Sequence, residues 1–110
     1  MNLLKVKQLE IYQTLDGQTP FIDWLESLKD KTGRYRIKER LDRVALGNMG
    51  DHKYIGDGVS EFRLDFGPGY RIYFAEEAKK IILLLCGGNK STQKKDIKKA
   101  INYWKDYLSR

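Results

Sequence analysis

The amino-acid sequence predicts an α+β fold in a single domain over residues 1–110, with the element order β-α-α-β-β-β-α. Apolar and polar residues alternate through 59–66 and again through 70–76, which is typical of neighbouring antiparallel strands with one buried face. Residues 80–86 are apolar on both faces, which indicates a central strand. Apolar residues recur at helical spacing before and after these strands, and the length of 110 residues is ordinary for one domain.

The N-terminal half is predicted to begin with a strand over residues 3–12 and to continue with two short helices. Pro20 suits the first position of a helix, and the preceding Thr19 is a residue type that caps helices. Asp30 is expected to cap the second helix. That helix ends at the Gly-Asn-Met-Gly run 47–50, where a residue can take a left-handed conformation.

The C-terminal half contains the three remaining strands and a last helix. Residues 51–58 are expected to form a loop, because they hold a Gly-Asp-Gly turn signal. The run Gly87-Gly88-Asn89 is expected to break the third strand. Residues 92–108 then form an amphipathic helix, with lysines on the face opposite its apolar stripe.

Positive charge is concentrated at the C-terminal end of the chain. The formal net charge is +6, and residues 90–110 contain seven basic and two acidic side chains. This asymmetry favours a polyanion or an acidic protein as the partner. The alternative is a solvated lysine-rich face of the last helix.

The composition also argues against several classes of protein. The single cysteine, Cys86, lies in an apolar run and has no partner for an internal disulfide, and without a Cys/His cluster a zinc site is not expected. The first residues lack the apolar core of a signal peptide, and the longest apolar run, 81–86, is too short to cross a membrane. We therefore expect a cytoplasmic protein that uses no metal, no cofactor and no membrane.

The two alternating strands are joined by a Gly-Pro-Gly turn, which sets their expected register. Pairing Phe66 with Tyr70 gives a three-residue hairpin loop, a common type. One face of this hairpin is then apolar and lies on the helices, while the other is a polar concavity or an open surface. An ordinary solvated face with a cross-strand ion pair is the alternative. The polar pairs that follow outward from the loop are Asp65 with Arg71 and Arg63 with Tyr73.

Four segments carry a resemblance to a known family. The most specific are EFRLDFGPGYRIYF at residues 61–74 and LLLCGGNKSTQ at residues 83–93. FIDWL at 21–25 and RLDRVALGN at 40–48 fit as well. Together they resemble the RelE/ParE toxin superfamily, and most closely its HigB-like branch of phage-derived addiction module killer proteins.

The resemblance implies a fold, an activity and a partner. The implied fold is a small, mostly antiparallel sheet with two N-terminal helices packed on one face, here followed by a basic amphipathic C-terminal helix. The implied activity is that of a type II toxin–antitoxin toxin that cleaves mRNA on the translating ribosome without a metal and so inhibits translation. The implied partners are the ribosome, mRNA and a cognate antitoxin, often one with a helix-turn-helix domain.

Residues that match the family's motif are candidates for the chemistry. Arg71 would stabilise the transition state at the phosphate, and Arg63 would bind the phosphate. Lys90 matches a basic position in the loop after the last strand, with a surface lysine near a helix start as the alternative. Glu61 is a candidate general base, although ribonuclease members carry a second basic residue at that position. The candidate catalytic residues are Arg71, Arg63, Lys90, Tyr73, His52 and Glu61, and the candidate RNA-binding residues are Lys53, Gln93, Lys94, Lys95 and Lys98.

Two of these candidates have further expected roles. Tyr73 is expected to stack on a base or to transfer a proton, with simple packing as the alternative. His52, expected in the loop before the hairpin, has a side chain suited to acid–base catalysis, with plain exposure as the alternative. A ParE-like poison of DNA gyrase and a non-catalytic antitoxin-binding protein remain the alternative functions.

Overall fold

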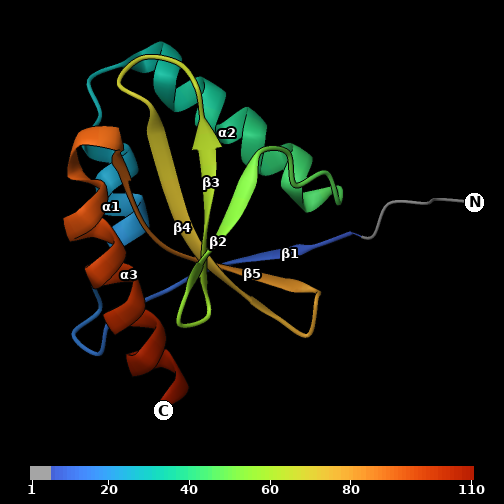
Figure 1. Ribbon diagram of the computed structural model, residues 1–110, viewed down its shortest axis with the longest axis vertical. Coiled ribbons are helices and arrows are strands. Elements are labelled where there is room, and N and C mark those ends of the chain that lie inside the picture. Colours follow the sequence, from blue (N-terminus) through green and yellow to red (C-terminus); the bar gives the residue numbers. More distant parts are fainter. Residues whose placement is uncertain (1–5) are drawn as a thin grey trace, which may run out of the picture.

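The computed structural model describes residues 6–110, and the elements within that range form one α+β unit (Figure 1). The predicted fold class is therefore confirmed, while residues 3–5 of the first predicted strand lie outside the described residues. In chain order the elements are β1 (Gln8–Ile11), α1 (Pro20–Ser27), α2 (Lys31–Ala45), β2 (His52–Gly56), β3 (Val59–Leu64), β4 (Tyr70–Glu77), β5 (Ile81–Asn89), the 3-10 turn η1 (Lys90–Thr92) and α3 (Gln93–Leu108).

The strands form one sheet in the order β1-β5-β4-β3-β2. β1 runs parallel to β5, and all other neighbours in the sheet are antiparallel. β5 thus lies between β1 and β4, as its apolar run predicts. The mostly antiparallel character expected from the alternating strands is confirmed.

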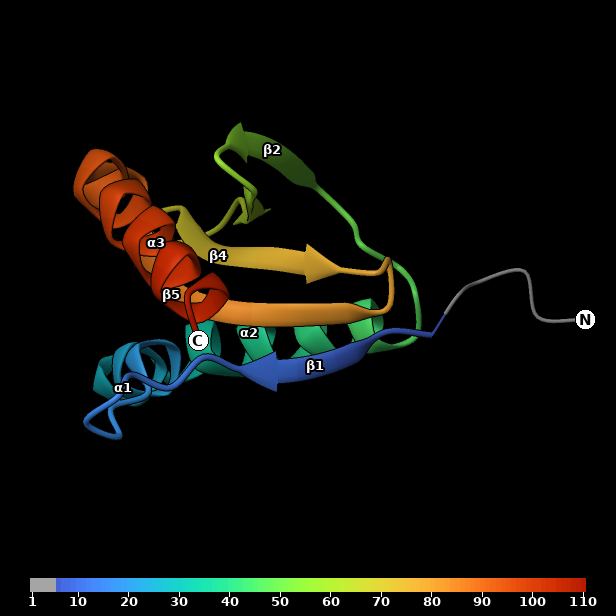
Figure 2. The same cartoon turned by 90° about the horizontal axis from the view of Figure 1, so that it is seen from below.

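The two faces of the sheet bury different cores. Helices α1 and α2 pack on one face, where side chains such as Phe21 and Ile37 meet Phe62. Helix α3 packs on the opposite face, where Ala100 lies in a cluster with Val59. Figure 1 shows α2 and α3 on the two sides of strands β3 and β4, and Figure 2 shows the same arrangement from below. The expected packing of both N-terminal helices on one face is confirmed.

A strand occupies most of the segment predicted to be a loop. Residues 52–56 form β2, an edge strand antiparallel to β3, so the sheet has five strands within residues 6–110 where four are predicted. Residues 52–54 are exposed, and residues 55 and 56 are partly exposed. The strand therefore lacks the apolar alternation that marks a half-buried strand. The Gly-Asp-Gly signal is a turn between two strands, with positive φ at Gly56, Asp57 and Gly58.

The helix ends follow the predictions with one exception. The carboxylate of Asp30 accepts a hydrogen bond from the Gly33 N–H at 2.9 Å, so the predicted cap of α2 is confirmed. Gly47, just after α2, has a φ of 97°, which is the left-handed conformation predicted there. Thr19 makes no capping hydrogen bond to α1, whose start depends instead on Pro20 at the first turn. No helix within residues 6–110 combines the length and the apolar character that crossing a membrane requires.

Gly87 and Gly88 do not break the third strand, because both lie inside β5. A Cβ at Gly87 would meet the indole ring of Trp24 from α1, and a Cβ at Gly88 would meet the carboxylate of Asp96 from α3. The glycines therefore let two helices approach the two faces of the strand closely. The glycine pair that indicates a strand end in the sequence is in fact a site of close helix packing.

Gly87→Ala is expected to destabilise the protein by about 1–3 kcal/mol, because the new methyl group would lie 2.5 Å from Cζ3 of Trp24 and the ring must move. Thermal unfolding should show a fall in Tm of about 4–8 °C for each kcal/mol. The control is the same substitution in a Trp24→Ala background, where no ring is left to displace and the added loss should be small. Equal losses in both backgrounds would contradict a steric origin.

Candidate functional site

The register of the β3–β4 hairpin differs from the prediction by two residues. Leu64, and not Phe66, pairs with Tyr70, and Arg63 pairs with Arg71. The reason is that Phe66 leaves the ladder: its carbonyl accepts a hydrogen bond from the Gly69 N–H at 3.0 Å and closes a tight turn. The predicted pairs of Asp65 with Arg71 and of Arg63 with Tyr73 are therefore wrong. An even shift keeps every side chain on its predicted face, so the division into an apolar and a polar face survives.

The polar face of the hairpin is neither an open surface nor a wide concavity, because α3 covers it. Glu61 is 2% exposed and Arg71 is 7% exposed. Nε of Arg71 lies 3.5 Å from Oε2 of Glu61, and the side chain of Gln93 in α3 donates a hydrogen bond to Oε1 of Glu61 at 3.1 Å. Three candidates from the sequence, Glu61, Arg71 and Gln93, therefore lie together. The sequence did not predict that the last helix buries them.

A groove remains open beside this buried cluster, between β2, the β3–β4 hairpin and the start of α3. Its volume is about 420 Å³. Four cations surround a single carboxylate among its lining residues, so the groove favours an anionic ligand. We call it the site groove; it is lined by Lys53, Tyr54, Ile55, Glu61, Arg63, Arg71, Lys90, Gln93 and Ile97.

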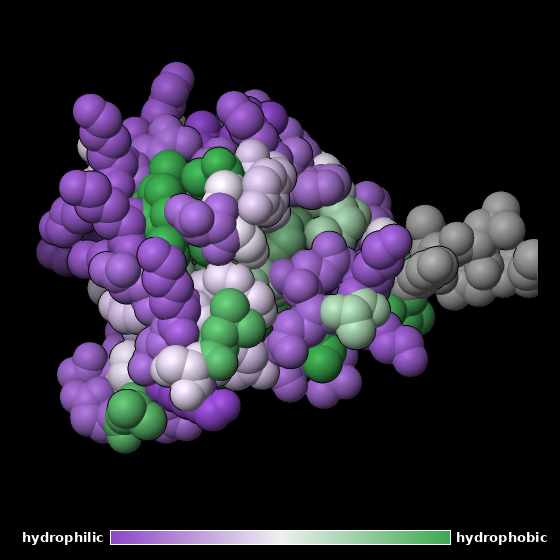
Figure 3. Space-filling view, turned by 60° about the horizontal axis from the view of Figure 1, so that its bottom comes forward, coloured by the Kyte–Doolittle hydropathy of each residue, from purple (hydrophilic) through white to green (hydrophobic). Residues whose placement is uncertain are grey.

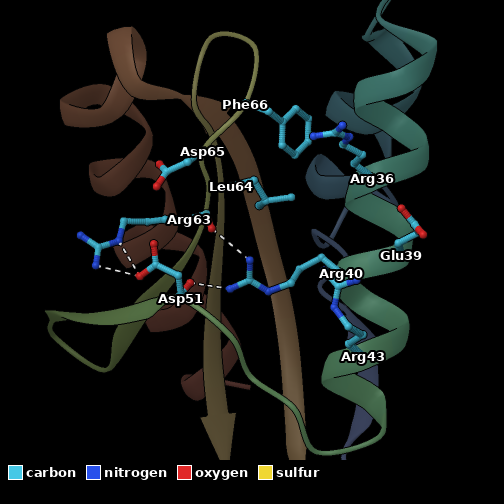
Figure 4. A pocket seen from close by; sticks show the side chains of 9 residues that line it. All are labelled: Arg36, Glu39, Arg40, Arg43, Asp51, Arg63, Leu64, Asp65 and Phe66. Atoms are coloured by element: carbon cyan, nitrogen blue, oxygen red, sulfur yellow. Dashed lines mark hydrogen bonds and ion pairs between the residues drawn. The ribbon is translucent and has the colours of Figure 1, made fainter.

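Arg63 is held at the rim of this groove by a carboxylate that sequence reasoning did not select. Nη2 of Arg63 lies 2.9 Å from Oδ1 of Asp51, and this hydrogen bond raises the pKa of Arg63. The Asp51 segment is fixed in turn by the buried guanidinium of Arg40, which donates to the main-chain carbonyl of Met49. The same guanidinium donates to the carbonyl of Asp51 (Figure 4). Neither contact leaves a sequence pattern, because each joins residues that are distant in the chain.

Tyr73 cannot stack on a base in this structure, because it is fully buried under α3. Burial, followed by the nearby carboxylate of Glu61, raises the pKa of its hydroxyl, which is consequently neutral. This hydroxyl has no hydrogen-bond partner among the described residues. Tyr73 pairs with Glu61 across the hairpin, so its place is beneath the site groove and not in it.

His52 does not join the other candidates. It is the first residue of β2 and not part of a loop, and it pairs with Phe62, so the two lie on the face of the sheet opposite Glu61 and Arg71. Its Nδ1 lies 2.9 Å from the carbonyl oxygen of Gly50. A role for His52 in acid–base chemistry at the site groove is therefore not supported by its position.

His52→Ala is accordingly expected to leave the affinity of the site groove for a polyanion within about twofold of the wild type, because exposed side chains away from a site contribute little. Titration with fluorescein-labelled heparin would measure this affinity directly. A larger loss of affinity in a variant that still melts like the wild type would mean that His52 reaches the ligand.

The lysines of α3 form a separate surface. Lys94, Lys95 and Lys98 are exposed and lie together with Lys99 and Asn102 in a shallow depression on the outer side of the helix. Of the polar residues of α3, Gln93 at its start lines the site groove, together with the apolar Ile97 one turn later. Hydrophilic side chains gather over the region of α3 in the space-filling view (Figure 3). The predicted RNA-binding residues are thus divided between the groove and an outer lysine face.

Other titratable groups near the groove are inert or structural. Burial raises the pKa of the Cys86 thiol to about 12, so it is protonated at neutral pH. Among residues 6–110, no three His, Cys, Asp or Glu side chains are placed to hold a metal ion together. The polar groups that line the site groove are thus those of arginine, lysine, one carboxylate, one amide and the phenol of Tyr54.

Comparison with known proteins covers this part of the chain. The family model of the phage-derived Gp49-like proteins (DUF891) matches residues 23–105, which include every residue that lines the site groove. The chain belongs to the Gp49-like family. This family is associated with addiction module killer toxins. The Gp49-like chain is also 46% identical, over 80 residues, to an uncharacterized protein of Haemophilus influenzae; the match covers 73% of this chain and 81% of the relative.

Proposed function

We propose that this protein is the toxin of a type II toxin–antitoxin system, of the RelE/ParE kind, and that it cleaves mRNA on the translating ribosome without a metal. The observation that carries the proposal is the site groove, in which four cations surround the carboxylate of Glu61. Membership of a family associated with killer toxins supports the toxin class. The groove supports the chemistry, because RNA cleavage needs both a proton acceptor and cations at the phosphate.

The proposed reaction is transfer of the phosphate to the neighbouring 2′-oxygen. Glu61 takes the proton of the 2′-hydroxyl, whose oxygen attacks phosphorus while the bond to the 5′-oxygen breaks. Arg71 and Arg63 stabilise the additional negative charge on the phosphate oxygens. Lys90 gives a proton to the leaving 5′-oxygen. The products are a 2′,3′-cyclic phosphate on one fragment and a 5′-hydroxyl on the other.

The buried ion pair holds Glu61 and Arg71 in fixed positions relative to each other. Glu61 is fixed by Gln93 on one oxygen and lies 3.5 Å from Arg71 on the other, so both reacting groups have few alternative positions. Arg71, whose Nη1 also donates a hydrogen bond to the Tyr70 carbonyl at 3.0 Å, lines the groove beside Lys90, which is exposed. Tyr73 beneath them is proposed to be a positioning residue.

Partners follow from the charge of the surface. The outer lysine face of α3 is proposed to bind ribosomal or messenger RNA phosphates, which predicts an affinity that falls steeply with salt. A co-transcribed antitoxin, acidic where it covers this surface, is proposed as the neutralising partner. Both partners are present in the cytoplasm, which is the proposed location.

Inducible expression tests the proposal. The wild type should arrest growth and generate RNA fragments with 5′-hydroxyl ends, whereas Arg71→Lys, which keeps the charge and loses the forked donors, should do neither. Arrest with intact mRNA and a DNA-damage response would favour a gyrase poison instead. Co-purification with a neighbouring gene product, without any toxicity, would favour a non-catalytic binding protein.

A further inference from the structure

A second basic groove lies next to the site groove, between α2 and the end of β3 (Figure 4). Its volume is about 500 Å³. Arginines from α2 line one wall, and Arg63, Asp65 and Phe66 line the other. We call this hollow the arginine groove, and nothing in the proposed reaction uses it.

Two exposed guanidinium groups line this groove and are accessible to a ligand. Arg36 and Arg43 are exposed, and neither forms an ion pair with any residue in 6–110. The guanidinium carbon of Arg36 lies 4.8 Å from the centre of the Phe66 ring, a cation–π contact that places an exposed guanidinium beside this aromatic side chain. Figure 4 shows Arg36 against this ring. A planar cation presented in this way suits stacking with a nucleobase.

The floor of the groove adds a positive charge that forms no ion pair within residues 6–110. Arg40 is 7% exposed, and its guanidinium donates hydrogen bonds to main-chain carbonyls, including that of Arg63 at 3.0 Å. Burial, with the neighbouring charge of Arg43, lowers its pKa. A guanidinium remains charged under these conditions, so an anion placed near Arg43 is attracted by both groups.

The two grooves lie on opposite sides of the β3–β4 hairpin and share lining residues near its turn. Arg63 lines both of them. A third, smaller hollow at the turn shares Asp65 and Phe66 with the arginine groove and shares Arg71 and Lys90 with the site groove. A flexible strand that lies on Arg71 can therefore continue past the hairpin tip into the arginine groove without leaving a basic surface.

We propose that the arginine groove binds a nucleotide of single-stranded RNA that flanks the cleaved bond. Its base stacks on Arg36, and its phosphate lies on Arg43. This inference rests on the proposed function and adds a subsite to it. A bare phosphate or a phosphopeptide fits less well, because Glu39 and Asp65 also line the groove. Carboxylates repel a phosphate but accept hydrogen bonds from base amino groups and ribose hydroxyls.

Binding of RNA probes of two lengths distinguishes this subsite from the site groove. The probes are fluorescein-labelled 2′-fluoro oligonucleotides of about four and about twelve nucleotides, which lack the attacking hydroxyl and span the range that single-strand grooves accommodate. Arg36→Ala/Arg43→Ala should bind the longer probe about tenfold more weakly than the wild type and the shorter probe equally well. The slope of log affinity against log salt for the longer probe should become shallower by about 0.7 for each phosphate that the variant no longer neutralises.

The matched control removes two charges from exposed positions of the same helix that do not line the groove, Lys31→Ala/Lys38→Ala. Equal binding by the two double variants would overturn the subsite and leave the proposed function intact. Tighter binding of a duplex RNA with the same dependence on arginine would overturn its single-strand character. Failure of the wild type to bind the longer probe, together with uncut mRNA in expressing cells, would overturn both the subsite and the proposed function.

Discussion

Arg71→Ala is expected to lower mRNA cleavage by about 10²–10³-fold, the usual cost of removing one preorganised group that stabilises transition-state charge. The reason is positional: Arg71 is 7% exposed, is held by Glu61 and by the main-chain carbonyl of Tyr70, and lines the site groove. Cleavage of a ribosome-bound message in a purified translation system measures the effect. Growth of cells that express the variant should then match that of cells without the toxin.

The same substitution also affects stability, and the two effects need to be separated. Removing Arg71 leaves Glu61, which is 2% exposed, with only the more distant Arg63, whose Nε lies 4.0 Å from Oε2 of Glu61, and breaking a buried pair costs up to about 3–5 kcal/mol. Arg71→Lys keeps a positive charge near Glu61 but offers no planar fork to a phosphate. It should melt close to the wild type and still lose most of the cleavage. Wild-type cleavage by a folded Arg71→Lys protein would show that only the charge is needed.

Glu61→Gln is expected to lower cleavage by about 10²–10⁴-fold, the contribution typical of a general base. The amide has the shape of the carboxylate, and its oxygen can still accept the hydrogen bond that Gln93 donates. The variant removes the anion beside Arg71, so its melting temperature is measured together with its cleavage. Binding of an uncleavable RNA should stay equal or become tighter, because a negative charge is removed from a basic groove.

The ratio of binding to cleavage then decides between two roles for Glu61. Loss of cleavage with RNA binding retained indicates a proton acceptor. A parallel loss of binding and cleavage would indicate that Glu61 serves only to hold Arg71. Gln93→Ala is the matched control, since it removes the hydrogen bond to Glu61 but leaves the carboxylate in place. Its effect on cleavage should be smaller than that of Glu61→Gln.

Much of the fold follows from patterns that the sequence shows directly. Alternation in β3 and β4 reports which side chains share a face, and the long apolar run of β5 reports a strand covered on both faces. Edge strand β2 could not be predicted, because its side chains are mostly exposed and show no apolar alternation. Gly87 and Gly88 are misleading because their small size serves helix packing, which depends on residues distant in the sequence.

Part of the lining of the site groove could be predicted from the sequence, but its arrangement could not. Glu61, Arg63 and Arg71 share a polar face, which alternation shows, and the groove does bring them near Lys90. The burial of Tyr73 and Glu61 depends on where α3 docks, and helix docking has no local signature. The side of the sheet on which His52 lies depends on the register of β2, a strand that the sequence does not reveal. Asp51, which pairs with Arg63, could not be selected from the sequence for the same reason.

The central claim is that the site groove cleaves mRNA through the 2′-hydroxyl on the ribosome. The most direct measurement is the chemistry of RNA ends produced when the purified protein is added to ribosomes stalled on a defined message. We expect a cut with a 5′-hydroxyl and a 2′,3′-cyclic phosphate, present with the wild type and absent with Glu61→Gln. A message that stays intact, or a cut that leaves a 5′-phosphate, would contradict the claim.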